Sequence, residues 1–502
     1  MRNMEEKLKY TVIVVALVAA FSVVQANPPF TVNVHAVGYG DTMNIGETAM
    51  AMFGPNFYTA SNTNERGTYP CAPFGRSTDG GQTWLPTLGF RDATAPNGWH
   101  TDPAIACDAQ GNVHMAIQYS TSVIRHYLST DGGVTWCDTS NISDPGTGGA
   151  VDRDWMIFDR GNLYEVFQEI NGGTEEGMRF CKSTDGGATW NRQTVVRTGS
   201  GGISTICVDP AGVIYFAYDQ SSTLYFLKST DQGGTWTTPV NLGNINYSTG
   251  YGDRAAMPNI CAPQNGMLML AWTDNRNGNW DVLYRRSTDG GANWTPVAIL
   301  NDSSVGGQFK VWMASDVFGG LHVMYYSTPS WPTSISSQMS MRYRYSPDGG
   351  ATLRPSIRVS DTTFQSWVSF LGEYHNILCD SQRVYLEWAD GRDGVNNELY
   401  FASALISELA AEEYPTVPER APVLRLPAFS QGDAELSVNL ARAGAVRLDV
   451  FDASGRLVRN LFNGLLPQGR TSLVAGNLPK NRPLFLRLSG VASETRKFIV
   501  LP

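Results

Sequence analysis

The eight residues Ser129-Thr130-Asp131-Gly132-Gly133-Val134-Thr135-Trp136 carry the pattern that decides the fold. The same pattern, Ser-x-Asp-x-Gly-x-Thr-Trp, returns at 77–84, 183–190 and 229–236, and two altered copies occupy 287–294 and 346–353. Successive copies begin 46 to 59 residues apart. A pattern that recurs six times at such steps indicates a repeated structural unit.

Each copy has the chemistry of a tight hairpin turn. The Asp carboxylate accepts hydrogen bonds from turn amides, and the glycines adopt positive φ without strain. The Thr begins the next strand, and the Trp offers a large apolar face for packing between neighbouring sheets. We therefore expect a structural role, and no direct chemical one, for the six Asp residues of the pattern. They are Asp79, Asp131, Asp185, Asp231, Asp289 and Asp348.

The segments between the copies share one order of strands. An apolar strand ends in an Asp and a small turn, as at 104–111, and an aromatic-rich strand follows, as at 113–119. A third strand leads into the eight-residue pattern, and a fourth leaves it. Four short strands in roughly 50 residues are typical of one blade of a β-propeller, so we predict an all-β fold.

The number of blades depends on how the ring closes. The last repeat, Glu373 to Ala402, has three strands but lacks the eight-residue pattern, and Phe30 to Val37 is an isolated strand-like run. Pairing these two segments closes the ring and removes exposed sheet edges. We therefore favour seven blades and keep six as the alternative. A single short helix is predicted, over 406–413.

The chain divides into four segments. Residues 1–26 have the basic start, short apolar core and small-residue cleavage site of a secretory signal peptide, although an uncleaved anchor is the alternative. We assign 27–408 to the propeller and 409–421 to a linker rich in Pro and Glu. Residues 422–502 alternate apolar and polar side chains, which predicts a small β-sandwich.

Charge and cysteine content limit the possible partners. The chain has a net charge of -9, and its basic residues gather after Ala421, so the propeller itself is acidic and nucleic acid is an unsuitable partner. Four of the seven cysteines stand at equivalent strand positions, which favours small core residues. A disulfide between two of Cys71, Cys137 and Cys181 is an alternative that the sequence leaves open. No spacing of Cys or His suggests a metal site, and we expect no cofactor.

Two parts of the chain resemble known families. The eight-residue patterns resemble the Asp-boxes (bacterial neuraminidase repeats) of the sialidase-like β-propeller superfamily, over most of 40–403. The superfamily includes sialidases, other glycosidases and non-catalytic proteins, so the resemblance implies the fold more than the function. Residues 446–456 and 497–500 resemble the type A sorting domain of the type IX secretion system. That resemblance implies export by the outer-membrane machinery of a Gram-negative bacterium, with release or surface attachment.

Propellers usually bind ligands at the face opposite such hairpins. A sialidase there holds the substrate carboxylate with three arginines, and uses a Tyr nucleophile paired with a Glu and an Asp acid. The Arg-Ile-Pro motif usual in the family is absent here. On this scheme the candidate catalytic residues are Tyr374, Glu373, Asp102, Arg153, Arg254 and Arg276. The candidate binding residues are Trp280, Trp331, Trp367, Tyr251 and Arg392, of which Tyr251 and Arg392 are also alternatives for the nucleophile and the third arginine.

Two of these arginines also stand in a repeated motif. Trp272-Thr273-Asp274-Asn275-Arg276 and Trp388-Ala389-Asp390-Gly391-Arg392 occupy equivalent places in two blades, which favours a structural Asp–Arg pair. Two functions remain open. One is a glycoside hydrolase, and the other is a non-catalytic surface propeller for adhesion or protein interaction. We expect a monomer whose partner is an extracellular glycan or glycoprotein.

Overall fold

A computed structural model gives the fold, and it describes the chain over separate ranges of residues. These ranges are 29–30, 32–37, 45–63, 72–85, 100–120, 122–143, 150–170, 177–197, 204–246, 258–329, 338–365, 371–372, 374–410, 424–425, 429–431, 434–440, 444–453, 455–467, 469–490 and 494–501. The chain forms two compact units, Met1–Glu412 and Glu413–Pro502. The division falls inside the segment that the sequence assigns to the linker.

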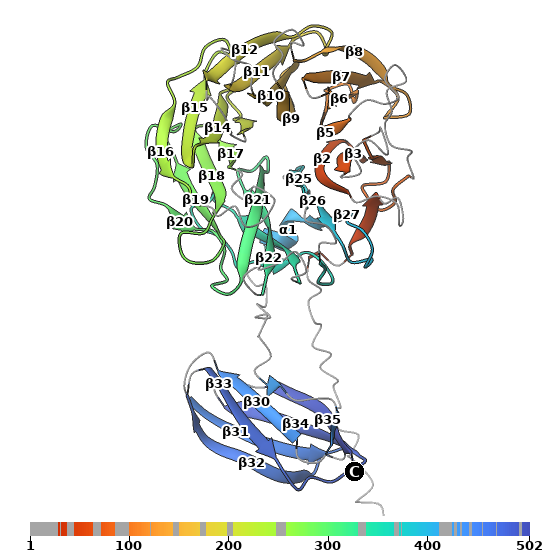
Figure 1. The fold of residues 1–502 in the computed structure, drawn as a ribbon, viewed down its shortest axis with the longest axis vertical. Helices are drawn as coiled ribbons and strands as arrows, with labels where there is room; N and C mark the ends of the chain where they lie inside the picture. Colours follow the sequence, from red (N-terminus) through yellow and green to blue (C-terminus); the bar gives the residue numbers. More distant parts are fainter. Residues whose placement is uncertain are drawn as a thin grey trace, which may run out of the picture. The chain divides into compact units, whose positions relative to one another are not determined.

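The described strands of the first unit form seven antiparallel sheets around a ring, the number of blades that the sequence favours (Figure 1). The innermost strands are β2 (Ile45–Phe53), β5 (Thr101–Cys107), β9 (Ala150–Asp159), β13 (Ser204–Val208), β17 (Asn259–Gln264), β21 (Gly307–Ser315) and β25 (Asn376–Cys379). Each innermost strand contacts the next one, and β25 contacts β2. The fold is therefore the expected all-β propeller.

The outer strands follow in chain order. The second strands are β3 (Asn56–Thr63), β6 (Val113–Ser120), β10 (Asn162–Ile170), β14 (Ile214–Gln220), β18 (Met267–Asp274), β22 (Leu321–Thr328) and β26 (Arg383–Asp390). The third strands are β4 (Phe74–Ser77), β7 (Val123–Ser129), β11 (Gly177–Ser183), β15 (Thr223–Ser229), β19 (Asp281–Ser287), β23 (Ser340–Ser346) and β27 (Glu398–Leu405). The fourth strands are β8 (Cys137–Asn141), β12 (Asn191–Arg197), β16 (Val240–Asn244), β20 (Ala298–Ile299) and β24 (Ile357–Arg358).

The ring closes by pairing the first strand with the last. Strand β1 (Val34–Val37) lies antiparallel to β27, with Val34 opposite Phe401, and completes the sheet of β25 and β26. The predicted pairing of these two distant segments is therefore confirmed. The helix α1 (Ile406–Ala410) follows β27 directly and buries Ile406 and Leu409.

The eight-residue pattern forms the same hydrogen-bonded turn at all six places. The Ser hydroxyl donates to one Asp oxygen at 2.7–2.8 Å, and the amide of the residue four positions after the Asp donates to that oxygen at 2.8–2.9 Å. The Thr hydroxyl, or the Asn293 amide, donates to the other oxygen. These donors stabilise the carboxylate and lower the pKa of Asp131 to about 2. Because every Asp oxygen is engaged by the turn itself, the Asp residues are structural.

The Trp that ends five of the six patterns packs on the preceding blade, as predicted, while the pattern at 346–353 ends in Leu353. Trp136 meets Phe74 of β4 edge to face, with 5.3 Å between ring centroids. Trp236 meets Phe180 of β11 in the same way at 5.0 Å. Aromatic pairs of this geometry stabilise beyond their buried area. The repeated pattern thus joins one sheet to the next around the ring.

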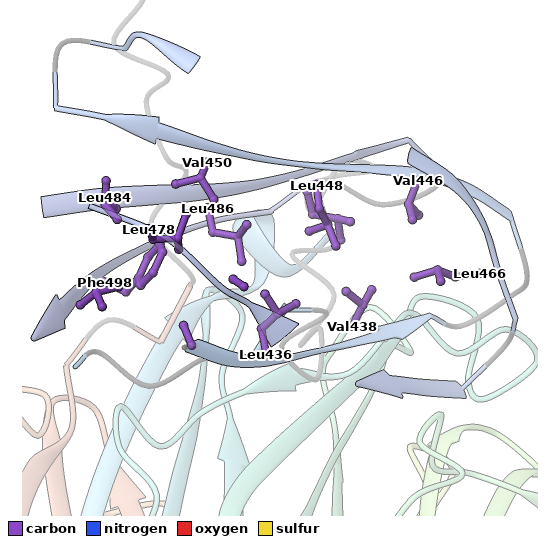
Figure 2. Packing of buried hydrophobic residues seen from close by; sticks show 14 of the residues in the cluster. Leu436, Val438, Val446, Leu448, Val450, Leu466, Leu478, Leu484, Leu486 and Phe498 are labelled. Carbon is purple, nitrogen blue, oxygen red and sulfur yellow. The ribbon is translucent and has the colours of Figure 1, made fainter. Parts of the chain in front are cut away.

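The second unit is a sandwich of two sheets. One sheet contains β28 (Leu424–Arg425), β30 (Ala434–Leu440) and β33 (Gly469–Ala475). The other contains β29 (Phe429–Gln431), β35 (Glu494–Leu501), β34 (Pro483–Gly490), β31 (Gly444–Asp452) and β32 (Leu457–Leu466). Figure 2 shows Leu436 and Val438 of β30 across from Leu448 and Leu486 of the larger sheet. The alternating pattern predicted this arrangement, since alternate residues of a strand face one side.

Other predictions concern the cysteines and the membrane. Cys107, Cys137, Cys181, Cys207, Cys261 and Cys379 all carry free thiols, while Cys71 lies outside the described residues. Burial raises the pKa of the Cys181 and Cys261 thiols to about 12, as expected of core residues. Within the ranges given above, no helix has the length and apolar character needed to cross a membrane.

Candidate functional site

Four innermost strands carry an extra residue near their start. In β2, β5, β9 and β21, two consecutive residues lie opposite a single residue of the second strand, which makes a β-bulge. The first bulge residue has a positive φ in every case: 51° at Glu47, 49° at Asp102, 59° at Arg153 and 55° at Lys310. All four side chains are charged, and none is more than 8% exposed.

The backbone of these bulges is strained because a residue other than glycine occupies the position with positive φ. An L-residue in the left-handed region costs about 1–2 kcal/mol, a cost that glycine avoids. Four charged residues hold this conformation at equivalent positions, although glycine would fit the backbone better. Strained residues of this kind cluster at functional sites. The bulges therefore mark the candidate site.

The candidate site and the hairpins lie at opposite ends of the sheets. The first and third strands of each sheet are both antiparallel to the second strand, so they run in the same direction. The bulges lie near the starts of the first strands, and the hairpins follow the ends of the third strands. This placement agrees with the expectation that ligands bind opposite the hairpins.

Two acidic bulge residues are bridged by one amide. The Asn62 side-chain nitrogen of β3 donates to Glu47 at 2.5 Å and to Asp102 at 3.0 Å. Because both carboxylate oxygens contact the same nitrogen, they lie within about 5.5 Å of each other. Both carboxylates are 4% exposed. The contact joins the first and second blades, and it places the predicted residue Asp102 beside Glu47, which the sequence analysis did not select.

Two further carboxylates lie next to this pair. Asp154 is the second residue of the β9 bulge, and Glu165 lies on the adjacent strand β10. Burial, and then the charge of Asp102, raises the pKa of Asp154 well above its ordinary value, while a side-chain hydrogen bond with Glu165 acts in the opposite direction. Burial and the neighbouring Asp154 raise the pKa of Glu165 in the same way. Four carboxyl groups from three blades thus share one region.

The basic residues of the third blade already have acidic or polar partners. Arg153 donates to the Gln168 carbonyl oxygen at 3.1 Å and lies 3.4 Å from Asp152. Arg179 of β11 forms a buried ion pair of 3.2 Å with Glu169. Arg153 was predicted as one of three arginines that hold a substrate carboxylate. Its contacts within the blade favour a role in supporting the acidic residues.

Aromatic side chains from separate blades meet at the ring's inner strands. Trp155 of β9 lies 4.8 Å from Trp312 of β21, measured between ring centroids. The predicted nucleophile Tyr374 lies against both rings, at 6.3 and 6.4 Å. Trp155 follows Asp154 directly and is only partly buried. These rings therefore bring an apolar surface next to the carboxyl groups.

Two basic groups lie beside the aromatic residues. The Lys310 ammonium donates to the Gly372 carbonyl oxygen at 2.5 Å. Burial, and secondarily the Lys310 charge, lowers the pKa of His375 well below its ordinary value, so the imidazole is neutral at pH 7. The predicted Glu373, between these segments, lies outside the described residues. A Tyr374–Glu373 pair therefore stays a prediction.

Arg276 and Arg392 each pair with an Asp of their own loop, and their roles as catalytic and binding residues stay predictions. Arg276 contacts both oxygens of Asp274 at 2.9 and 2.6 Å, and the Trp272 indole donates to that carboxylate at 3.1 Å. Arg392 contacts one oxygen of Asp390 at 2.5 Å, and the Trp388 indole donates to the same oxygen at 3.0 Å. The repeated motif had favoured this structural Asp–Arg pair.

Trp280 requires correction as a binding residue. Its side chain is 3% exposed, so its ring is buried in the blade and offers no face to a ligand. The remaining candidates, which are Arg254, Tyr251, Trp331 and Trp367, lie outside the described residues.

Sequence reasoning missed Glu47, Asn62, Glu165 and Lys310. A signal was present for Lys310, because it places a charge inside an otherwise apolar run, Phe309-Lys310-Val311-Trp312. Asn62 and Glu165 gave no such signal, since each lies on the second strand of its blade, where the sequence predicts a structural role. No group of three or more His, Cys, Asp or Glu in the described ranges has an arrangement that could hold a metal ion.

Comparison with known proteins finds limited sequence similarity. No family model matches the chain. A xyloglucanase from a Paenibacillus species is 28% identical over 247 residues, which cover 44% of this chain and 23% of the relative. A xyloglucanase from Acetivibrio thermocellus is 25% identical over 244 residues, covering 44% and 28%. The chain thus matches less than a third of the length of either relative.

Solved structures give weak matches over about three quarters of this chain. An α-L-arabinanase from Penicillium chrysogenum in complex with arabinobiose is 16% identical, with a TM-score of 0.42, over 75% of this chain and 98% of that one. The NanB sialidase from Streptococcus pneumoniae is 12% identical, with a TM-score of 0.40, over 76% and 71%. An ulvan lyase is 12% identical, with a TM-score of 0.45, over 74% and 98%.

Proposed function

We propose that the propeller binds an extracellular polysaccharide and hydrolyses its glycosidic bonds with the inner-strand carboxyl groups. The observation that carries this proposal is the bridge from Asn62 to Glu47 and Asp102. Retaining glycosidases use two carboxyl groups about 5–5.5 Å apart. The Glu47 and Asp102 oxygens lie within about that distance of each other. We therefore propose retention of anomeric configuration.

The two carboxyl groups take different roles in this scheme. Protonated Asp102 gives its proton to the glycosidic oxygen while Glu47 attacks the anomeric carbon, which forms a glycosyl–enzyme ester. Asp102 then takes a proton from water, and the resulting hydroxide equivalent releases the sugar from Glu47. The Asn62 amide holds both side chains in place, and the strained bulges fix their direction. In this scheme Asp102 is the acid, as predicted from the sequence. Glu47 is the nucleophile in place of Tyr374, which was predicted to act with Glu373.

The aromatic residues supply the binding surface. Sugar faces stack on aromatic rings, and Trp155, Trp312 and Tyr374 lie together beside Asp154. The sequence similarity to xyloglucanases supports xyloglucan as the substrate. The acidic residues of the bulges make an anionic sugar such as a sialoside a less suitable substrate.

A second candidate function is glycan binding without catalysis. Glu47 and Asp102 are each only 4% exposed, which is unusual for groups that must touch a substrate. In this case the carboxyl groups organise the inner strands, and the partly exposed Trp155 carries the binding. The resemblance to Asp-box propellers is compatible with either function.

We also propose an extracellular location. The N-terminal segment resembles a signal peptide, and the second unit resembles a type IX sorting domain. On this proposal, the outer-membrane secretion machinery is a partner of the C-terminal β-sandwich. The propeller is then released or held at the surface of a Gram-negative bacterium as a monomer.

The test is hydrolysis by the purified full chain of xyloglucan, other neutral glycans and a sialoside. Glu47→Gln and Asp102→Asn should each lower turnover about a hundredfold or more. Asp159→Asn is the matched control, because it removes a carboxylate from the far end of β9 and should leave turnover unchanged. Retention is read from the anomer first formed, by NMR. Glycan binding without turnover would support the second candidate, and neither binding nor turnover would refute both.

A further inference from the structure

Asp154 and Glu165 form a buried carboxyl pair that lacks hydrogen-bond donors. Asp154 is 2% exposed and Glu165 is not exposed at all. Within the described part of the chain, no N–H or O–H group of another residue donates a hydrogen bond to any of their four oxygens. Asp154 and Glu165 lie on the paired strands β9 and β10, close enough for one carboxyl group to donate to the other when it is protonated. Two ionised carboxylates at such a place would repel each other and leave four oxygens without donors.

We propose that Asp154 and Glu165 share one proton, so that the pair carries a single negative charge behind Asp102. The proton makes one carboxyl group the donor and the other the acceptor, which satisfies the contact between them. The arrangement is that of two carboxyl groups too close together to ionise at the same time.

The described groups around the pair are acidic, neutral or paired with other residues. Asp152 of β9 adds negative charge near Asp154, and Asp102 of β5 does so when it is ionised. Cys181 of β11 lies opposite Glu165, and its thiol is neutral because burial raises its pKa to about 12. The guanidinium groups of this blade contact other residues, since Arg153 donates to Gln168 and Arg179 pairs with Glu169. On β6, the Gln118 amide donates to the Val151 carbonyl oxygen.

The shared proton has a consequence for the candidate site, and this consequence rests on the proposed function. A fixed negative charge behind Asp102 disfavours ionisation of Asp102. It therefore helps Asp102 to keep the proton that a general acid must donate. Asp154 and Glu165 are positioning residues in this scheme, because they act through Asp102 and do not touch the substrate.

Infrared spectroscopy of the full chain tests the proton directly, without any assay of activity. A protonated carboxyl group absorbs at a C=O frequency separate from that of carboxylates. Two further buried carboxyl groups hold a proton at pH 7 in this scheme: Glu387, whose pKa is about 8, and the proposed acid Asp102. The double variant Glu387→Gln with Asp102→Asn should therefore keep one protonated carboxyl band at pH 7. Absence of that band would overturn the proposal even if no variant of the pair folds.

Variants of the pair assign the band. Glu165→Gln and Asp154→Asn should each abolish it when introduced into the Glu387→Gln, Asp102→Asn background, because an amide then donates to the remaining carboxylate. A band that survives in both variants, with circular dichroism unchanged, would also overturn the proposal.

The pH dependence of kcat/KM tests the consequence for Asp102. Glu165→Gln keeps one negative charge on Asp154 and should leave the pH profile in place. Asp154→Asn with Glu165→Gln removes the charge, so the pKa of Asp102 falls and the basic limb of the profile should move to lower pH. If wild-type protein hydrolyses nothing, the proposed function fails, while the infrared result still decides the shared proton. If the pH profile of kcat/KM in the Asp154→Asn, Glu165→Gln variant matches that of the wild type, Asp154 and Glu165 are not positioning residues.

Discussion

The Thr59 hydroxyl of β3 donates a 2.7 Å hydrogen bond to Glu387 of β26, and this contact joins the first blade to the last. Thr48 of β2 donates to the same carboxylate oxygen. Glu387 has no exposed surface, and its other oxygen has no partner among the described residues. Burial raises the pKa of Glu387 to about 8. The seam between the two blades is therefore built around a neutral carboxyl group.

Stability of the propeller should decrease as pH rises through the neutral range. The folded state holds the Glu387 proton up to about pH 8, whereas the unfolded chain releases it near the ordinary value of 4.5. The stabilisation is complete below pH 4.5 and is lost as pH rises toward 8, at about 1.4 kcal/mol per pH unit. Glu387→Gln should remove this contribution, so that its unfolding free energy depends less on pH than that of the wild type, as measured by denaturant unfolding at several pH values. The exposed Glu408→Gln should instead follow the wild type, and parallel curves for Glu387→Gln would contradict the assignment.

Glycine at a bulge should stabilise the fold relative to alanine. Asp102→Gly and Asp102→Ala both remove the carboxylate, but only glycine tolerates the positive φ of 49° without strain. The glycine variant should therefore be about 1 kcal/mol more stable than the alanine variant. Both should lack the activity that we propose for Asp102. Equal denaturation midpoints for the two variants would show that the bulge is unstrained.

Removal of Arg276 should affect stability and leave the proposed activity intact. Asp274 is 1% exposed, so Arg276→Ala leaves a buried carboxylate without its cation. The expected loss is about 1–2 kcal/mol, since the Trp272 and Asn246 donors remain. Thermal unfolding and kcat/KM on the same preparation check both parts. A large fall in kcat/KM without loss of stability would instead support the predicted catalytic role of Arg276.

The stability of the hairpin in one blade should depend on the Asp of its eight-residue pattern. Asp185→Ala removes the acceptor for Thr189 and Ser183, so the turn that follows β11 loses three hydrogen bonds. We expect a lower unfolding midpoint and faster proteolysis near 183–190, with glycan binding unchanged because the bulges lie at the other end of the sheets. Asp185→Asn keeps an acceptor oxygen and should lie between the wild type and Asp185→Ala.

The fold could be predicted from the sequence because it is encoded locally and repeatedly. Each copy of the pattern contains the Asp, the glycines and the Trp that its turn requires, so one copy explains the others. The closure of β1 on β27 followed from counting strands. The alternating apolar residues of β30 and β31 similarly predicted the two facing sheets of the C-terminal unit.

The candidate site could be predicted only in part, because it is formed by residues from different blades. Asp102 and Tyr374 were selected from their residue types, and both lie among the inner strands. Glu47 and Glu165 were not, since only the three-dimensional structure brings them near Asp102. Arg276 shows the reverse case, where a residue of suitable chemistry is already engaged by its own loop.

Because β1 pairs with β27, the ring can close only after the last strand of the propeller has been synthesised. Residues 34–37 are made first, and their partner at 398–405 follows only after every other strand of the propeller. Contacts between such distant segments form slowly, because a long loop must close first. Until residues 398–405 have been made, the strand that pairs with β1 in the finished ring is absent.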